Sequence, residues 1–163
     1  MSGSSVDRVR AALLAAGHDD TIQAFPDGTR SAADAAAAVG CDVAQIAKSI
    51  VFRAGPRAVL VIASGANRVD MAKVAAAIGQ PVKRADGIWV RDATGFAIGG
   101  VSPVGHHSPP IILLDEDLLA LDPLWAAAGS PMHVFRTSAA ALLRLTGGKA
   151  AAVKEVTPPT APL

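Results

Sequence analysis

The sequence is poor in several features that would narrow its class. Cys41 is the single cysteine among 163 residues, so no disulfide can form within the chain. No run of about 18 apolar residues occurs, which argues against a membrane-spanning helix. The first residues also lack the basic-then-apolar order of a secretion signal. Together these absences favour a protein of the reducing cytoplasm that has no membrane partner.

Net charge and aromatic side chains are also sparse. The formal net charge is +1, so no global basic field indicates nucleic-acid binding, and a DNA partner is not expected. The charge is nevertheless uneven, because residues 43–91 carry eight basic and two acidic side chains. This segment is either a solvated surface or a face that meets phosphates.

Hydrophobic residues make up 51% of the chain although aromatic residues supply only 4%. A chain of this length can therefore bury one core, built mainly from small and aliphatic side chains. We assign residues 1–156 to a single domain and the proline-rich residues 157–163 to a disordered tail.

Capping residues and hydrophobic periodicity predict a mixture of short helices and strands. Helices are expected over 5–16, 31–40, 43–47, 70–78, 115–121 and 138–145. Strands are expected over 21–25, 49–52, 58–63, 82–85, 111–114, 124–128 and 133–137, with an edge strand over 151–156. Residues 86–95 fit either a brief helix or a segment that is extended at 88–90. The mixture predicts an α+β fold with a mixed, barrel-like β-sheet surrounded by short helices.

The most unusual stretch is the glycine loop, which we define as residues 94–105. It holds four glycines in twelve residues, and Pro103 follows Ser102 within it. Glycine permits positive φ and close approach of another backbone, while proline fixes its own φ. The loop is therefore either a structural turn or a rigid turn with exposed amides that receive carbonyl or phosphate oxygens.

Two known site motifs do not fit this loop. Gly100 and Ser102 begin a nucleophile elbow, but the second glycine of that motif comes one position late, and Pro103 has no N–H for an oxyanion hole. A Walker-type phosphate loop would need Gly-Lys-Ser/Thr, whereas two histidines follow Gly105. Adjacent histidines point to opposite sides of an extended chain, so no metal site is expected.

Lys48 is the most unusual charged residue, because apolar residues flank it where a helix is expected to give way to a strand. Lysine is rarely buried unless it is paired. Its ammonium would either bind a phosphate, carboxylate or carbonyl at the mouth of a pocket, or reach solvent along its stem. His133, which follows a Gly129–Pro131 turn, either lines a pocket or is a hydrogen-bonded strand histidine.

Three segments stand in a recognisable order and spacing: Gln45–Phe52, Gly65 with Val69–Ala75, and Thr94–Gly105. In this arrangement they resemble the YbaK/prolyl-tRNA synthetase-associated family of editing domains. The resemblance runs from about Ser31 to Val156. It implies a mixed, barrel-like sheet surrounded by helices. It also implies hydrolysis of mischarged aminoacyl-tRNA without a metal, a cofactor or a covalent nucleophile.

The resemblance further implies roles for individual residues. Lys48 matches the family's lysine, which anchors the ribose-phosphate end of the substrate. Gly99–Pro103 matches the family's G-x-x-x-P turn, whose amides orient the aminoacyl carbonyl. The residues implied to be catalytic are Lys48, Gly99, Gly100, Ser102 and Pro103. Those expected to bind substrate are Ser49, Val101, Gly129, Ser130 and His133.

We therefore expect a free-standing trans-editing deacylase in which water attacks the aminoacyl ester. An aminoacyl ester is already activated, so positioning and oxyanion stabilisation can supply the acceleration. The expected partners are mischarged tRNA of the tRNA(Pro) type and prolyl-tRNA synthetase. Two alternatives stay open: a non-catalytic tRNA- or synthetase-binding module of the same fold, and a small-molecule ester or amide hydrolase. The sequence does not assign the amino acid that is removed.

Overall fold

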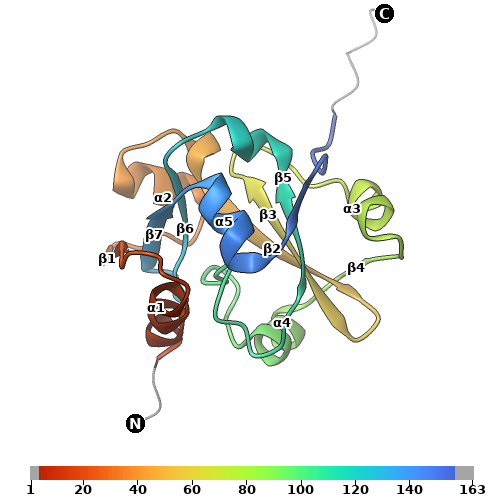
Figure 1. The fold of residues 1–163 in the computed structure, drawn as a ribbon, viewed down its shortest axis with the longest axis horizontal. Helices are drawn as coiled ribbons and strands as arrows, with labels where there is room; N and C mark the ends of the chain where they lie inside the picture. The colour runs from red at the N-terminus through yellow and green to blue at the C-terminus, as the bar shows by residue number, and fades with distance from the viewer. Residues whose placement is uncertain (1–3, 157–163) are drawn as a thin grey trace, which may run out of the picture.

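The computed structural model describes residues 4–156 as packed layers of helices and sheets (Figure 1). The helices of this part of the chain are α1 (Ser5–Ala15), α2 (Ala32–Val39), α3 (Met71–Ile78), α4 (Gly87–Thr94) and α5 (Ala139–Thr146), with 3-10 turns η1 (Val43–Gln45) and η2 (Glu116–Ala120). Its strands are β1 (Ile22–Ala24), β2 (Ala47–Ala54), β3 (Arg57–Ser64), β4 (Lys83–Arg84), β5 (Ile111–Asp115), β6 (Leu124–Ala127), β7 (His133–Thr137) and β8 (Lys149–Ala151). None of these helices is long and apolar enough to cross a membrane.

β2 and β3 form the centre of a five-stranded sheet with the strand order β4-β2-β3-β5-β8. They pair antiparallel along their whole length, from Ala47 opposite Ser64 to Ala54 opposite Arg57. β5 and β8 continue the sheet in parallel pairings. β3 is buried at every position after Arg57, because it is covered on both faces.

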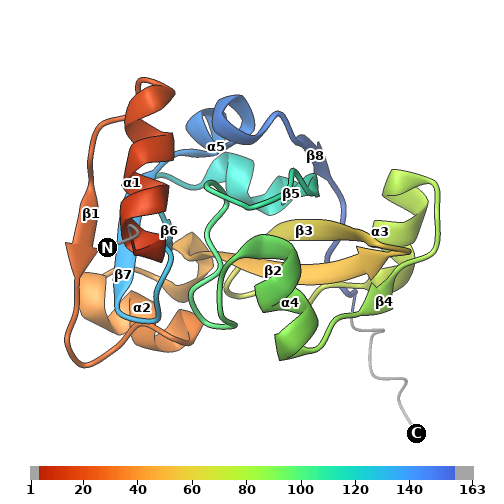
Figure 2. The ribbon, with the colours of Figure 1, turned by 90° about the horizontal axis from the view of Figure 1, so that it is seen from below.

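A second sheet, with the order β1-β7-β6, lies beside the first (Figure 2). Between the two sheets, an isolated bridge pairs Ile46 with Trp125 at the start of β2. This bridge does not extend into a ladder, so neither sheet closes on itself within the described residues. The α+β class is confirmed, whereas the expected barrel-like closure is not.

Side chains that alternate along β3 build a core on each face of the central sheet. Leu60 and Ile62 pack with residues of α1, α4 and α5 on one face. Val59 and Val61 pack with Val74 of α3 on the other face. The neighbouring strand β2 therefore has an α3 side and an opposite side, and each of its residues faces one or the other.

Most helices begin at the residues that the sequence indicates. Ser31, Asp70 and Ser138 cap α2, α3 and α5 through their side-chain oxygens, as expected. The cap of α1 is Ser4 rather than Ser5, because Ser4 forms a reciprocal capping box with the first turn of that helix.

The start of β2 differs from the expectation. The helical turn expected over 43–47 is a 3-10 turn that ends at Gln45, and the strand already begins at Ala47. The Asp42 amide donates to the Gln45 Oε1 at 3.1 Å, and the turn ends where the Ile46 amide donates to the Val43 carbonyl. Lys48 therefore lies inside the strand and not at a helix–strand junction.

Three further segments can be compared with the structure expected from the sequence. Residues 88–90 are helical, so the extended alternative is wrong; Asp86 caps α4 by accepting a bond from the Trp89 amide at 2.8 Å. The last strand is β8 and not 151–156, because pairing with β5 occurs at residues 149–151. The tail expected over 157–163 lies outside the described residues.

Candidate functional site

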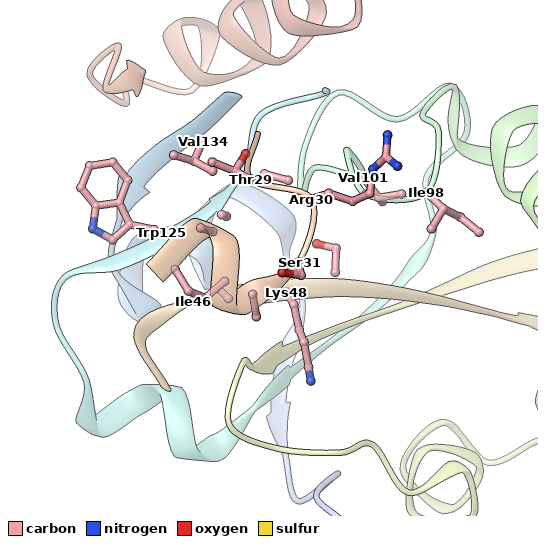
Figure 3. A pocket seen from close by; sticks show the side chains of 16 residues that line it. Thr29, Arg30, Ser31, Ile46, Lys48, Ile98, Val101, Trp125 and Val134 are labelled. Carbon is pink, nitrogen blue, oxygen red and sulfur yellow. The ribbon is translucent and has the colours of Figure 1, made fainter. Parts of the chain in front are cut away.

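Two cavities adjoin beside the first half of β2. The first, of about 240 Å³, lies between the start of α2, β2, β6 and the glycine loop (Figure 3). The second, of about 290 Å³, continues along β2 toward α4. Both cavities are lined by Ser49, Ile98, Gly99 and Val101, which we call the shared wall. Three of these four residues are among those that the sequence predicts for the site.

Ser49 supplies a hydroxyl group to the shared wall. It faces the cavities because its neighbours Lys48 and Ile50 lie on the α3 side of the strand. The Oγ atom is buried and has no hydrogen-bond partner within residues 4–156. A buried hydroxyl left unpaired costs about 1–3 kcal/mol. A ligand atom that pairs with Ser49 would therefore be bound favourably.

The glycine loop contributes backbone to the shared wall. Gly99 has a φ of 94°, which favours glycine. A Cβ atom on Gly100 would lie 2.7 Å from the Ser130 Cα, so the loop reaches this position only without a side chain. The Gly100 amide donates to the Ala97 carbonyl at 3.0 Å. Within residues 4–156 the amides of Gly99 and Val101 donate to no acceptor.

Ser102 and Pro103 lie behind the cavity wall and are buried. The Ser102 Oγ accepts a hydrogen bond from the Val104 amide at 3.2 Å. The Ser102 carbonyl accepts one from the His106 Nε2 at 2.6 Å. Among the described residues, no base contacts the Ser102 hydroxyl. The geometry thus gives Ser102 a part in shaping the loop, while the catalytic roles of both residues stay predictions.

Gly129, Ser130 and His133 form a turn on the far side of the glycine loop. A Cβ atom on Gly129 would lie 2.7 Å from the Ser5 carbonyl oxygen, so this turn also packs tightly against the start of α1. The Met132 amide donates to the Ser130 Oγ at 3.0 Å, and a hydrogen bond of 2.6 Å joins the Ser130 Oγ to the His133 Nδ1. None of the three predicted substrate-binding residues lines either cavity. Their contact with substrate stays a prediction.

Lys48 lines the first cavity, but its ammonium turns away from it (Figure 3). The Nζ atom donates to the Asn67 carbonyl at 2.5 Å, on the α3 side of the sheet. Burial lowers the pKa of the Lys48 ammonium; the Asp115 carboxylate opposes this shift, and Arg68 adds to it. The sequence therefore predicted that Lys48 belongs to the site, but it did not predict that the ammonium group points away from the cavity.

Two arginines that the sequence did not single out contact the glycine loop. Arg30 is exposed and lines the first cavity, and its Cγ lies 2.9 Å from where a Gly99 Cβ would be. Arg8 donates to the carbonyls of Gly105 and Gly95 at 2.6 and 2.8 Å. No local pattern marks either residue, because their partners lie far away along the chain.

A sequence model of the aminoacyl-tRNA editing domain family matches residues 26–145. The chain belongs to this family. The resemblance inferred from three sequence segments is thereby confirmed.

Relatives of this editing domain include solved structures. The crystal structure of a candidate trans-editing enzyme for prolyl tRNA synthetase is 44% identical with a TM-score of 0.89, covering 96% of this chain and 100% of its own. The hypothetical protein APE2540 is 26% identical with a TM-score of 0.84, covering 91% of this chain and 99% of its own. The uncharacterised protein YwhH of Bacillus subtilis (strain 168) is 28% identical over 127 residues, which are 77% of this chain and 81% of its own.

In this editing domain, His106 stabilises the glycine loop as a neutral ring. Its Nε2 donates to the Ser102 carbonyl, and its ring packs edge-on against Phe96 at 5.2 Å between centroids. The Nδ1 atom is buried and has no partner among residues 4–156. Burial therefore lowers the pKa of His106, although the bond to Ser102 opposes the shift; Arg8 and His107 lower it further.

We predict that His106 makes the editing domain less stable at acid pH. The unfolded chain binds a proton at a pKa of about 6.5, and the native ring binds it only at lower pH. Between the two values the unfolded state holds more protons, so the free energy of unfolding falls as pH drops through this window. In His106→Gln, which keeps a donor for Ser102, this part of the decline should disappear. Urea unfolding at pH 7.5 and 5.5 measures it, and an equal effect in His107→Gln would contradict the assignment.

Proposed function

We propose that this editing domain is a free-standing trans-editing deacylase, formed by residues 1–156 as one unit. It hydrolyses the ester of mischarged aminoacyl-tRNA by attack of water. The observation that carries the proposal is the shared wall, where the Ser49 hydroxyl and the amides of Gly99 and Val101 lack protein partners. These are the groups that a ribose hydroxyl and an ester carbonyl would pair with.

The two cavities suit the two ends of an aminoacyl-nucleoside. We place the ester at the shared wall, with the amino-acid side chain in one cavity and the terminal adenosine in the other. The carbonyl oxygen accepts from the loop amides, which stabilise the charge that develops as water attacks. No nucleophilic side chain is needed, because the ester is activated and is held in position. Within the glycine loop, the buried Ser102 accordingly serves to hold the turn.

Family membership and a relative support the proposed substrate class. The family is named for aminoacyl-tRNA editing, and one similar structure is described as acting for prolyl tRNA synthetase. We therefore propose tRNA(Pro)-type substrates, with that synthetase as a partner. The size of the cavity would select the amino acid, although one methylene changes discrimination by only about 1–3 kcal/mol.

A panel of mischarged tRNAs, assayed beside free aminoacyl esters, tests the proposal. Release of amino acid from one or more tRNAs supports deacylation. Tight tRNA binding without turnover would instead indicate a non-catalytic module of the same fold. Turnover of free esters alone would indicate a small-molecule hydrolase.

Removal of the Ser49 hydroxyl should separate activity from stability. We expect Ser49→Ala to lower single-turnover deacylation about 2- to 13-fold, the equivalent of one neutral hydrogen bond. Thermal stability should stay equal or rise, because the buried hydroxyl has no partner to lose.

A matched control for Ser49→Ala is available in α5. Ser138 caps that helix and lines neither cavity. Ser138→Ala should cost about 1 kcal/mol of stability and leave turnover unchanged. If Ser49→Ala behaves like this control, losing stability and keeping activity, Ser49 does not contact substrate.

Two substitutions in the glycine loop should diverge. Gly100→Ala places a Cβ atom against the Ser130 backbone and displaces the loop, so deacylation should fall by more than tenfold, about 1.4 kcal/mol. Ser102→Ala leaves each loop amide in place, so the folded variant should keep most of its turnover. Single-turnover rates, with circular dichroism as a check of folding, decide between them. A folded but inactive Ser102→Ala, together with a trapped aminoacyl-enzyme on wild type, would show that Ser102 is a nucleophile.

Lys48 is proposed to serve the site through the segment that follows β3. Its ammonium holds the Asn67 carbonyl, and the Asn67 amide donates to Asp115 at 2.8 Å. Loss of this charge-assisted bond in Lys48→Ala should lower deacylation at least about tenfold with the fold retained. Lys48→Met, which keeps the apolar stem, should lose as much, and Lys48→Arg should recover part of the rate. Turnover like that of wild type in Lys48→Ala would remove Lys48 from the site.

A further inference from the structure

Two cations line the first cavity, Lys48 and Arg30. The Lys48 ammonium turns to the α3 side of the sheet and donates to the Asn67 carbonyl. The Arg30 side chain lies on the other side of the cavity, against Gly99 (Figure 3). Arg30 is therefore the positive charge that a ligand in this cavity would meet at its mouth.

The Arg30 guanidinium is unpaired among the described residues. None of the ion pairs within residues 4–156 includes it, and its nitrogen atoms make no hydrogen bond there. Asp86 and Asp92 line an outer groove together with Arg30 and Arg91, but neither carboxylate comes within ion-pair distance of Arg30. A planar fork of donors is thus left free at the cavity.

The position of Arg30 is fixed even though its head is exposed. The preceding residue, Thr29, is buried and its amide donates to the Pro131 carbonyl at 2.6 Å. The following residue, Ser31, caps α2. The Arg30 Cδ and Nε lie 3.6 Å from where a Gly99 Cβ would be, so the stem covers Gly99 at the shared wall. Backbone and stem together direct the guanidinium to the rim of the site.

We propose that Arg30 binds the phosphate on the 5′ side of the terminal nucleoside of the substrate. The inference rests on the proposed function, which places the aminoacyl ester at the shared wall beside Arg30. The nearest anion of such a substrate is the phosphodiester attached to the ribose that carries the ester. A guanidinium fork matches two phosphate oxygens, which gives position as well as affinity.

A second exposed arginine provides the competing assignment. Arg84 lines the second cavity, on the other side of the shared wall. If the nucleoside lay there, Arg84 and not Arg30 would meet the phosphate. Arg84→Gln is therefore the matched control for Arg30→Gln.

The test compares two small substrates that differ by one phosphate: the 3′-aminoacyl esters of adenosine and of adenosine 5′-monophosphate. Wild type should hydrolyse the phosphorylated ester with a kcat/KM about tenfold higher, the effect of one partly exposed charge-assisted contact. Arg30→Gln should remove this preference by slowing only the phosphorylated ester. Arg30→Lys should keep part of it, and Arg84→Gln should keep all of it.

Two results would overturn the assignment. Equal slowing of both esters by Arg30→Gln would mean that Arg30 only supports the loop through Gly99. Loss of the preference in Arg84→Gln alone would place the phosphate at the second cavity. Circular dichroism of each variant checks that it is folded.

A binding experiment tests the role of Arg30 independently of the proposed deacylation. If wild type hydrolyses neither ester and no mischarged tRNA, deacylation is wrong, but titrations with adenosine and adenosine 5′-monophosphate still decide the role of Arg30. Tighter binding of the monophosphate that Arg30→Gln abolishes supports the phosphate site. Equal affinity of wild type for the two probes contradicts it.

Discussion

The arrangement of the site depends on the two-residue period of β2. Ala47 and Val51 pack into the core on one face of the sheet, and Phe52 packs into the core on the other. Pairing with β3 along the whole strand fixes this assignment, because a slip by one residue would exchange the two buried sets. Ser49 therefore faces the cavities while Lys48 faces α3. The neutral hydroxyl, and not the ammonium, points toward the wall where a ligand would lie.

Most of the fold could be predicted because its signals are local. Ser31, Asp70 and Ser138 each accept bonds from amides two or three residues ahead, so a helix start is visible within a few positions. The direction of Lys48 could not be predicted in this way. Ile50, Val51 and Phe52 are apolar on both faces of β2, so no alternation of polar and apolar residues next to Ser49 marks the face that meets a cavity.

The parts that sequence reasoning missed depend on contacts between distant segments. Arg8 contacts carbonyls that lie 87 and 97 residues away along the chain, and Arg30 reaches the glycine loop from the start of α2. Closure of the sheet would also require pairing between distant segments. The two sheets are joined by the isolated bridge between Ile46 and Trp125, and no ladder continues from it within the described residues. Composition and spacing do not show which distant segments come into contact. The predicted site therefore included three residues of the shared wall but neither Arg8 nor Arg30.

The distribution of unpaired polar atoms links the fold to its proposed chemistry. Within residues 4–156, the buried side-chain atoms without a partner are the Ser49 Oγ and the His106 Nδ1, and both adjoin the glycine loop or support it. Asp115, although fully buried, accepts bonds from Ser64 and Asn67. Polar groups left unpaired cost stability, so the unpaired Ser49 hydroxyl at the shared wall points to a function there. A reaction that uses water as its nucleophile needs donors that are fixed before the substrate arrives and are not already bound within the protein. The amides and hydroxyl of the shared wall meet this requirement because the loop behind them is held by other contacts.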